Sequence, residues 1–242
     1  MDAAIEDFRG ALTLLETEAR GHRPPIVRGG GRPVDQSCQA LLKVIRRRCP
    51  DLLPGGPVEA GQAVPAVPVD AGAASDVLVL ALQQSAATTA TGRVPTTEQL
   101  PKGVVWREGA DALAVHLEGT KVELGQGTVV VHFPVRCDQL RGATGVSVRF
   151  VIGTPDRPTG LLAATPSLPE GPEPVVQRWG EALTAYAWRA LLDTAGGIAA
   201  AAGHDADGNP LVATALAATP DGLLVLPQAR HPMDRVLGRT VR

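Results

Sequence analysis

The chain has 242 residues, 44% of them hydrophobic, which is enough for one large domain or for a medium domain with an appendage. Aromatic residues make up only 3%, so the core is expected to use small side chains that bury little area each, and this favours assembly with partners. The formal charge of −2 argues against a globally basic nucleic-acid-binding protein.

Positive charge is concentrated in one early segment. Between Arg20 and Arg48 there are eight basic residues and one acidic residue, so the rest of the chain is acidic. The chain is also rich in Arg, Ala, Gly, Pro and Val, a bias typical of high-GC coding. A single arginine therefore carries less functional information than usual.

The cysteines and the first residues indicate the compartment. There are three cysteines, Cys38, Cys49 and Cys137, and an odd number without tight spacing does not describe a disulfide framework. The chain opens with acidic residues rather than a basic segment followed by an apolar run. No apolar stretch approaches the roughly 20 residues of a membrane span. The sequence predicts a cytoplasmic protein without membrane contact.

Residues 2–20 are expected to form an amphipathic helix. Asp2 can cap its start and Gly21 ends it. Apolar residues recur at spacings of three and four, which places them on one stripe. The residues of this stripe that we assign to partner binding are Ile5, Phe8, Leu12 and Leu15.

A basic loop and a second helix follow. The loop, residues 22–33, holds three glycines between Arg28 and Arg32, and such glycines can turn backbone N–H groups toward an anion. The helix, residues 35–48, buries an apolar face that includes Ile45 and ends at Pro50. Its last turn carries basic residues that could neutralise phosphates or simply complement the helix dipole. They are Arg46, Arg47 and Arg48.

The chain divides into four parts. Residues 1–53 form a basic two-helix head, which is too small to bury both apolar stripes and must cover the main domain or a partner. Residues 54–75 are rich in Pro, Ala and Val and read as a linker. Residues 76–230 form the main domain, and residues 231–242 are a basic tail.

The main domain is predicted to be rich in β-strands. The apolar run 77–82 is compatible with a strand or a helix, and its β-branched residues favour a strand. Hydrophobic residues alternate through 103–153, with turn residues at short intervals, as in an antiparallel meander. Residues 155–174 are proline-rich and read as an irregular loop.

A long Ala-rich helix is expected over residues 173–202, followed by a hairpin of residues 211–216 and 223–226. The turn between them, Thr219 to Gly222, has Pro and Gly where turns favour them. The predicted fold is α+β: a mainly antiparallel sheet, meander plus C-terminal hairpin, covered by a long Ala-rich helix, with an N-terminal two-helix appendage.

Metal ligation is weighed at His116, His132 and Cys137. The two histidines could share a polar face if their strands are neighbours, but zinc needs a third ligand and usually a fourth. Cys137 lies five residues after His132, so an ideal strand places it on the opposite face. Surface histidines are the favoured interpretation, and no metal or cofactor is predicted.

Other candidate chemistry also has a simpler explanation. Residues 204–210 resemble a calcium loop, but the spacing fails for an EF-hand and suits a helix-to-strand turn. Glu170 and Glu173 lie in a Pro-rich segment that holds carboxylates poorly. No catalytic residue is predicted. The tryptophans read as core anchors, with two on different sides of the 173–202 helix, and they are Trp106, Trp179 and Trp188.

The favoured function is a non-enzymatic protein-interaction or assembly subunit of a larger complex, whose head helices and sheet edges bind a protein partner or a second copy. One alternative is a nucleic-acid or anion-binding protein that uses residues 20–48. The other is an enzyme with dispersed catalytic residues near the central strands. Its first candidates are His116, His132, Arg136 and Asp138.

Overall fold

The computed structural model describes residue 45 and residues 57–59, 62–91, 100–140, 142–160 and 165–229. The predicted helix 2–20, the basic loop and the tail 231–242 lie outside the described residues. In chain order the elements are β1 (Val67–Asp70), α3 (Ala71–Thr91), β2 (Gly103–Glu108), β3 (Asp111–His116), β4 (Lys121–Gly125), β5 (Thr128–Cys137), β6 (Thr144–Val151), β7 (Thr159–Gly160), β8 (Thr165–Pro166), α4 (Glu173–Ala202), β9 (Val212–Thr219) and β10 (Gly222–Gln228).

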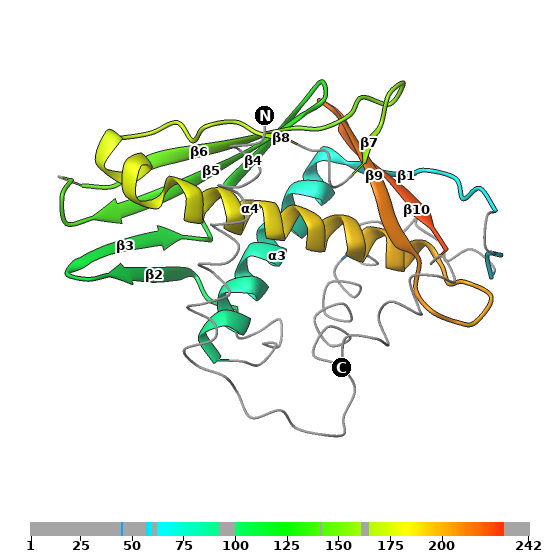
Figure 1. The fold of residues 1–242 in the computed structure, drawn as a ribbon, viewed down its shortest axis with the longest axis horizontal. Coiled ribbons are helices and arrows are strands. Elements are labelled where there is room, and N and C mark those ends of the chain that lie inside the picture. The colour runs from blue at the N-terminus through cyan, green and yellow to red at the C-terminus, as the bar shows by residue number, and fades with distance from the viewer. Residues whose placement is uncertain are drawn as a thin grey trace.

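The strands form two antiparallel sheets, and the α+β prediction is confirmed (Figure 1). The six-stranded sheet has the order β2-β3-β5-β6-β8, with β4 also paired to β5. The four-stranded sheet has the order β1-β10-β9-β7. Backbone bonds join the two sheets: Gly127 N–H donates to Ala218 O, and Ala218 N–H donates to Gly153 O, both at 2.9 Å.

The meander and the hairpin form where alternation predicts them. Along β5, residues at every second position are buried, from Val129 to Cys137, while those between them face outward. The hairpin of β9 and β10 closes through Pro220 and Asp221, with Thr219 paired to Gly222. In the meander and in β10 buried residues alternate with more exposed ones, so the period of two is visible in the sequence, whereas Leu216, Ala217 and Ala218 of β9 are buried in succession.

Helix α4 agrees with the predicted range 173–202. Its first half is amphipathic, whereas nearly every residue from Thr194 to Ala201 is buried. Alanine and glycine dominate this second half, and their small side chains let the helix approach its neighbours closely. In Figure 1, α4 runs across both sheets, and it packs on α3, β6, β9 and β10.

The strand predicted over residues 77–82 is wrong, because these residues lie inside helix α3. Asp70 caps the helix: its Oδ1 accepts a hydrogen bond from Ala73 N–H at 2.9 Å. Most of α3 is buried on more than one side, so its apolar residues form a continuous run instead of a stripe. Such a run cannot be told from a buried strand by periodicity.

Part of the predicted linker belongs to the folded body. Residues 67–75 form β1 and the first turn of α3, and β1 pairs with β10. Earlier in the linker, Val58 N–H donates to His204 O at 2.9 Å and Val58 O accepts from Ala206 N–H at 3.0 Å. Pro68 has no backbone N–H to donate. Because β1 is an edge strand of its sheet, a missing donor on the unpaired side breaks no hydrogen bond to a neighbouring strand.

The predicted loop 155–174 contains two short strands. β7 pairs with β9, and β8 pairs with the end of β6. The strap formed by residues 165–170 continues along β6, where Ser147 and Glu170 exchange backbone hydrogen bonds of 2.8 and 2.9 Å. The strap therefore covers the backbone edge of β6.

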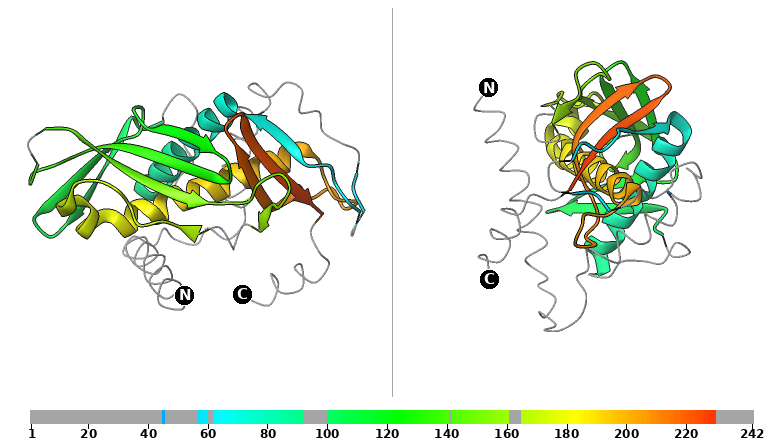
Figure 2. Two further views of the ribbon diagram at one scale, coloured as in Figure 1. Left: turned by 90° about the horizontal axis from the view of Figure 1, so that it is seen from above. Right: turned by 90° about the vertical axis from the view of Figure 1, so that its right-hand side faces the viewer.

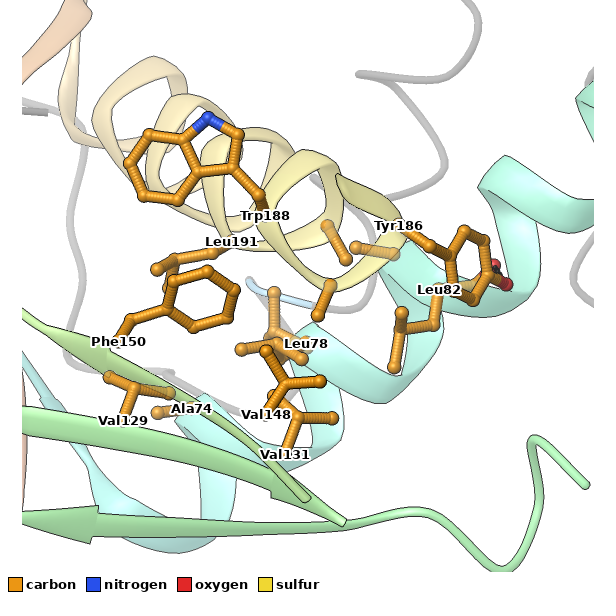
Figure 3. Close-up of a cluster of buried hydrophobic side chains, with 14 of the residues drawn as sticks. Ala74, Leu78, Leu82, Val129, Val131, Val148, Phe150, Tyr186, Trp188 and Leu191 are labelled. Atoms are coloured by element: carbon orange, nitrogen blue, oxygen red, sulfur yellow. Dashed lines mark hydrogen bonds between the residues drawn. The ribbon is translucent and has the colours of Figure 1, made fainter. Parts of the chain in front are cut away.

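A single cluster of buried side chains joins helices and strands (Figure 3). Trp106 lies against Tyr186 in an edge-to-face arrangement, with ring centroids 5.4 Å apart. Trp188 packs on Phe150 with centroids 5.6 Å apart. The tryptophans are thus part of the core, as predicted. Ile45, from the predicted second head helix, is fully buried in the same cluster.

Candidate functional site

One side of the six-stranded sheet carries many polar and partly exposed side chains. Helices α3 and α4 lie against the other side, and no described helix covers this one (Figure 2). We call it the open face and define it by its outward side chains. These are Val105, Arg107, Ala112, Ala114, His116, Lys121, Glu123, Val130, His132, Pro134, Arg136, Ser147, Arg149 and Val151.

Large hydrophobic side chains are exposed on this side. Val105 is 55% exposed and Val151 is 50% exposed, at outward positions of β2 and β6. Leu168 is 89% exposed and lies on the strap, where it lines a small pocket together with open-face residues. Among the residues that the structure describes, these are all the exposed large hydrophobic side chains. Val151 pairs with Thr128 at the start of β5, and Leu168 lines the pocket beside Arg149, whereas Val105 lies in line with Ala114 and Arg136 near the other end of the sheet.

Three polar residues on neighbouring strands form the centre of the open face, and we call them the polar trio: Glu123 on β4, His132 on β5 and Ser147 on β6. His132 Nδ1 lies 2.8 Å from Ser147 Oγ, and His132 Nε2 lies 3.3 Å from Glu123 Oε2. His132 and Ser147 are directly opposed. Because the Ser147 backbone bonds to Glu170 instead of β5, this is a non-hydrogen-bonded pair, whose side chains lie closest.

The trio has part of the chemistry of a hydrolase. A histidine between a hydroxyl and a carboxylate can take a proton from the hydroxyl and be oriented by the acid. The pocket beside it has a volume of about 70 Å³, well below the several hundred Å³ typical of substrate sites. The backbone N–H of Ser147 already donates to Glu170 O, so it cannot stabilise an oxyanion.

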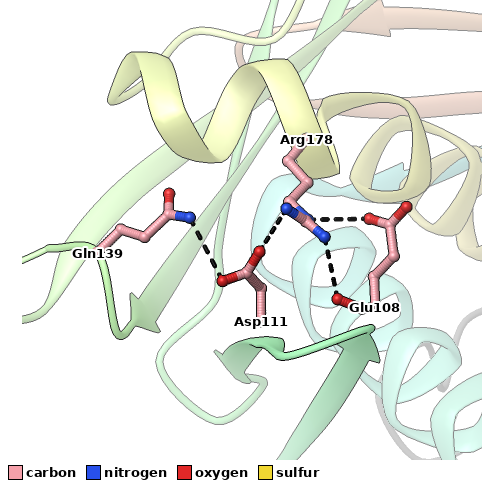
Figure 4. A network of polar contacts seen from close by, with 4 residues as sticks. All are labelled: Glu108, Asp111, Gln139 and Arg178. Carbon is pink, nitrogen blue, oxygen red and sulfur yellow. Dashed lines mark hydrogen bonds and ion pairs between the residues drawn. The ribbon is translucent and has the colours of Figure 1, made fainter.

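A second polar cluster has a structural explanation (Figure 4). Arg178 on α4 donates to Glu108 Oε2 and to Glu108 O, both at 3.0 Å, and forms an ion pair with Asp111. Gln139 Nε2 donates to Asp111 Oδ1 at 3.4 Å. These bonds fasten the first half of α4 to the β2–β3 turn. The adjoining hollow of about 630 Å³ is shallow, and the Arg178 donors that face it are engaged.

The three residues weighed as metal ligands are not brought together. His116 and His132 both face outward, as the sequence allows, but Cys137 is buried on the opposite face. No group of three or more His, Cys, Asp or Glu side chains suited to a metal occurs within the described ranges. The geometry therefore offers two surface histidines and a core cysteine.

The possible calcium loop is a turn in which the Asp205 carboxylate is hydrogen-bonded by other residues of the same turn. Asp205 Oδ1 accepts hydrogen bonds from the N–H groups of Asp207 at 3.0 Å and Asn209 at 2.8 Å. Both carboxylate oxygens accept from Asn209 Nδ2 at 3.1 Å. Asp205 is 3% exposed, so its carboxylate is directed into the turn between α4 and β9.

Of the enzyme candidates, only His132 belongs to the polar trio. Arg136 and Asp138 are exposed at the end of β5 and beyond it. Glu170 bonds to β6 through its backbone, and Glu173 accepts from Gln177 at 2.8 Å on the first turn of α4. Sequence reasoning missed Glu123 and Ser147, although both stand at outward positions of strands beside His132. The predicted partner-binding stripe Ile5, Phe8, Leu12 and Leu15 and the anion candidates Arg28, Arg32, Arg46, Arg47 and Arg48 lie outside the described residues.

The fold and the site define an α+β protein with two joined antiparallel sheets and an open sheet face. Comparisons with protein-family models, curated proteins and solved structures find no match to this chain. Of the helices in the described part, none has the length and apolarity needed to cross a membrane. The cytoplasmic location stays a prediction from the sequence.

Proposed function

We propose that the protein is a subunit of a protein assembly and that it contacts its partner through the open face. The observation that carries the proposal is the position of the exposed large hydrophobic side chains. Those of the described residues, Val105, Val151 and Leu168, all lie on the open face or on the strap beside it. Burial of such side chains by a partner is a main source of association free energy.

The composition of the open face also supports this proposal. Apolar side chains such as Val130 and Pro134 alternate there with His132, Arg149 and other polar groups. Non-obligate interfaces, whose partners are also stable alone, mix apolar and polar side chains in this way. A few buried side chains then contribute most of the binding free energy. The small pocket at the polar trio favours surface recognition over binding of a substrate.

Charge substitution on the open face tests the proposal. In the 242-residue chain, Val151→Lys combined with Leu168→Lys places two charges where a partner would exclude water. We expect the wild-type protein to be recovered in species heavier than a monomer, measured by native mass spectrometry of gently purified material. The double variant is expected to be recovered as a monomer.

The control places two lysines on the helix side, as Gln177→Lys with Glu181→Lys at exposed positions of α4. This control should retain the heavier species. Equal recovery of heavier species from the open-face variant, or a wild-type protein that is monomeric under every gentle condition, would contradict the proposal. Circular dichroism checks that both variants fold.

A further inference from the structure

Strand β2 ends the six-stranded sheet, and one side of its backbone faces away from the sheet. Its neighbour within the described residues is β3 alone. The strands are joined by a two-residue turn with Gly109 at φ 61° and a residue of negative φ after it, the pattern of a type II′ turn. In such a hairpin the closing pair, Glu108 and Asp111, is hydrogen-bonded across the ladder.

The turn determines which backbone groups point outward. Because alternate residues bond to β3, the even-numbered residues of β2 point their N–H and C=O groups inward. Lys102, just before the strand, follows the same parity: its C=O accepts from Leu117 N–H at 2.8 Å. The N–H and C=O groups of Gly103, Val105 and Arg107 therefore point to the free edge.

Within the described residues, the centre of β2 carries no proline, bulge or charge that would block strand addition. The strand contains no proline, and no bulge interrupts its register with β3. At its centre is Val105, 55% exposed, with glycine and valine before it. Proteins usually block such an edge with central charges, prolines or bulges. An unblocked edge of six residues is a template for another strand.

We propose that β2 pairs with β2 of a second copy, antiparallel and about a twofold axis through Val105. This rests on the proposed function, since it names a second copy as one partner of the subunit. With Val105 opposite its own counterpart, Gly103 lies opposite Arg107 of the second copy, and the reverse pair forms by symmetry. All three outward-pointing residues of each strand then exchange hydrogen bonds.

Charge complementarity selects this register. It places Lys102 opposite Glu108 of the second copy, twice per dimer, on one face of the joined sheet. The side chain of Lys102 is 81% exposed and that of Glu108 is 59% exposed, although each also forms an ion pair within its own chain, with Glu118 and Arg178 respectively. Moving the twofold axis two residues toward the turn places Arg107 opposite Arg107 of the second copy. Moving it one residue removes the pairing of Lys102 with Glu108. Opposite charges across strands stabilise a pair and like charges destabilise it.

A charge-exchange experiment on the 242-residue chain tests the register. Lys102→Glu alone sets two carboxylates opposite Glu108, and Glu108→Lys alone sets two ammonium groups opposite Lys102. We expect each variant to dimerise about tenfold more weakly than wild type in sedimentation equilibrium. An equimolar mixture restores opposite charges at both positions, so it should recover mixed dimers in native mass spectrometry. Recovery requires that both variants are folded.

A backbone substitution tests the edge itself. Val105→Pro removes an outward N–H and leaves the ladder to β3 intact, so it should yield monomers. Val105→Thr keeps the N–H and the branched shape, and it should remain dimeric. Dimers that persist in Val105→Pro, or single charge variants that the mixture does not rescue, would overturn the proposal.

The failure of this inference can be told apart from failure of the proposed function. A monomeric wild-type protein that still binds a different protein through Val151 and Leu168 refutes the β2 dimer and leaves the assembly role standing. Dimers that are lost in Val151→Lys with Leu168→Lys but kept in every β2 variant place self-association on the open face instead.

Discussion

Tyr186 joins the two helices through one hydroxyl group. Its Oη donates to the backbone C=O of Leu82 on α3 at 2.5 Å, and its ring packs against Trp106 and Phe133. Burial raises the pKa of the Tyr186 hydroxyl above its ordinary value, so this group is a protonated donor at neutral pH.

Removing this hydroxyl tests its contribution. Tyr186→Phe keeps the ring and deletes the donor, so we expect the free energy of unfolding to fall by about 1–2 kcal/mol. Urea denaturation followed by tryptophan fluorescence measures the change. Thr214→Val, which removes an exposed side-chain hydrogen bond to Leu226 O, is a control expected to cost less. An equal or larger loss in the control would show that the buried bond has no special weight.

Single residues also limit what the sequence predicts of the site. His132 is identified from strand alternation, but its neighbours Glu123 and Ser147 depend on register. The position of Glu123 beside His132 follows from the β4–β5 hairpin, which closes between Gly125 and Thr128, and the position of Ser147 follows from the pairing of β5 with β6. A search for motifs treats each strand alone, so it finds the histidine and misses the trio.

Element by element, the sequence predicts what has a clear periodicity. The strands of the meander have one buried and one exposed side, and α4 has both in its first turns before most of the helix becomes buried, so both were predicted in the right places. Helix α3 is buried on several sides, which erases its stripe, and the run 77–82 was therefore read as a strand. Strand β1 was not predicted because prolines in and before it are typical of a linker, and because its partner strand β10 is far away in the sequence.

The junction of the two sheets depends on Gly153. A Cβ atom at this position would lie 2.1 Å from Thr159 N and 2.4 Å from Arg157 O, both backbone atoms that cannot turn away. We expect Gly153→Ala to destabilise the protein by about 2–3 kcal/mol in thermal or urea unfolding. The matched control is Gly145→Ala in β6, where a Cβ would have nothing within 4 Å. Similar stability of the two variants would contradict the close packing at the junction.

For the molecule as a whole, Ile45 shows that the early part of the chain contributes to the core. It is fully buried in the cluster that joins both helices and both sheets. The sequence places Ile45 on the apolar face of the second head helix, and at this residue the face is covered within the same molecule. The cover of the first predicted helix stays a prediction.

Ile45→Ala should therefore destabilise the whole fold. Loss of a fully buried isoleucine costs about 2–5 kcal/mol, and we expect one cooperative transition at lower urea concentration. Glu181→Ala, at an exposed position of α4, is the control and should shift the midpoint little. A wild-type midpoint in Ile45→Ala would show that residue 45 packs on the body without supporting it.

Helix α4 also determines how the protein can move. Its 30 residues extend about 45 Å at 1.5 Å per residue, and they contact β6 of one sheet and β9 and β10 of the other. Hinge bending between the two sheets would require α4 to kink or to slide along the residues that its alanines pack against. Helix α4 thus keeps the two sheets at a fixed separation. A partner bound near β2 and a partner bound near β10 are therefore held at a constant distance from each other.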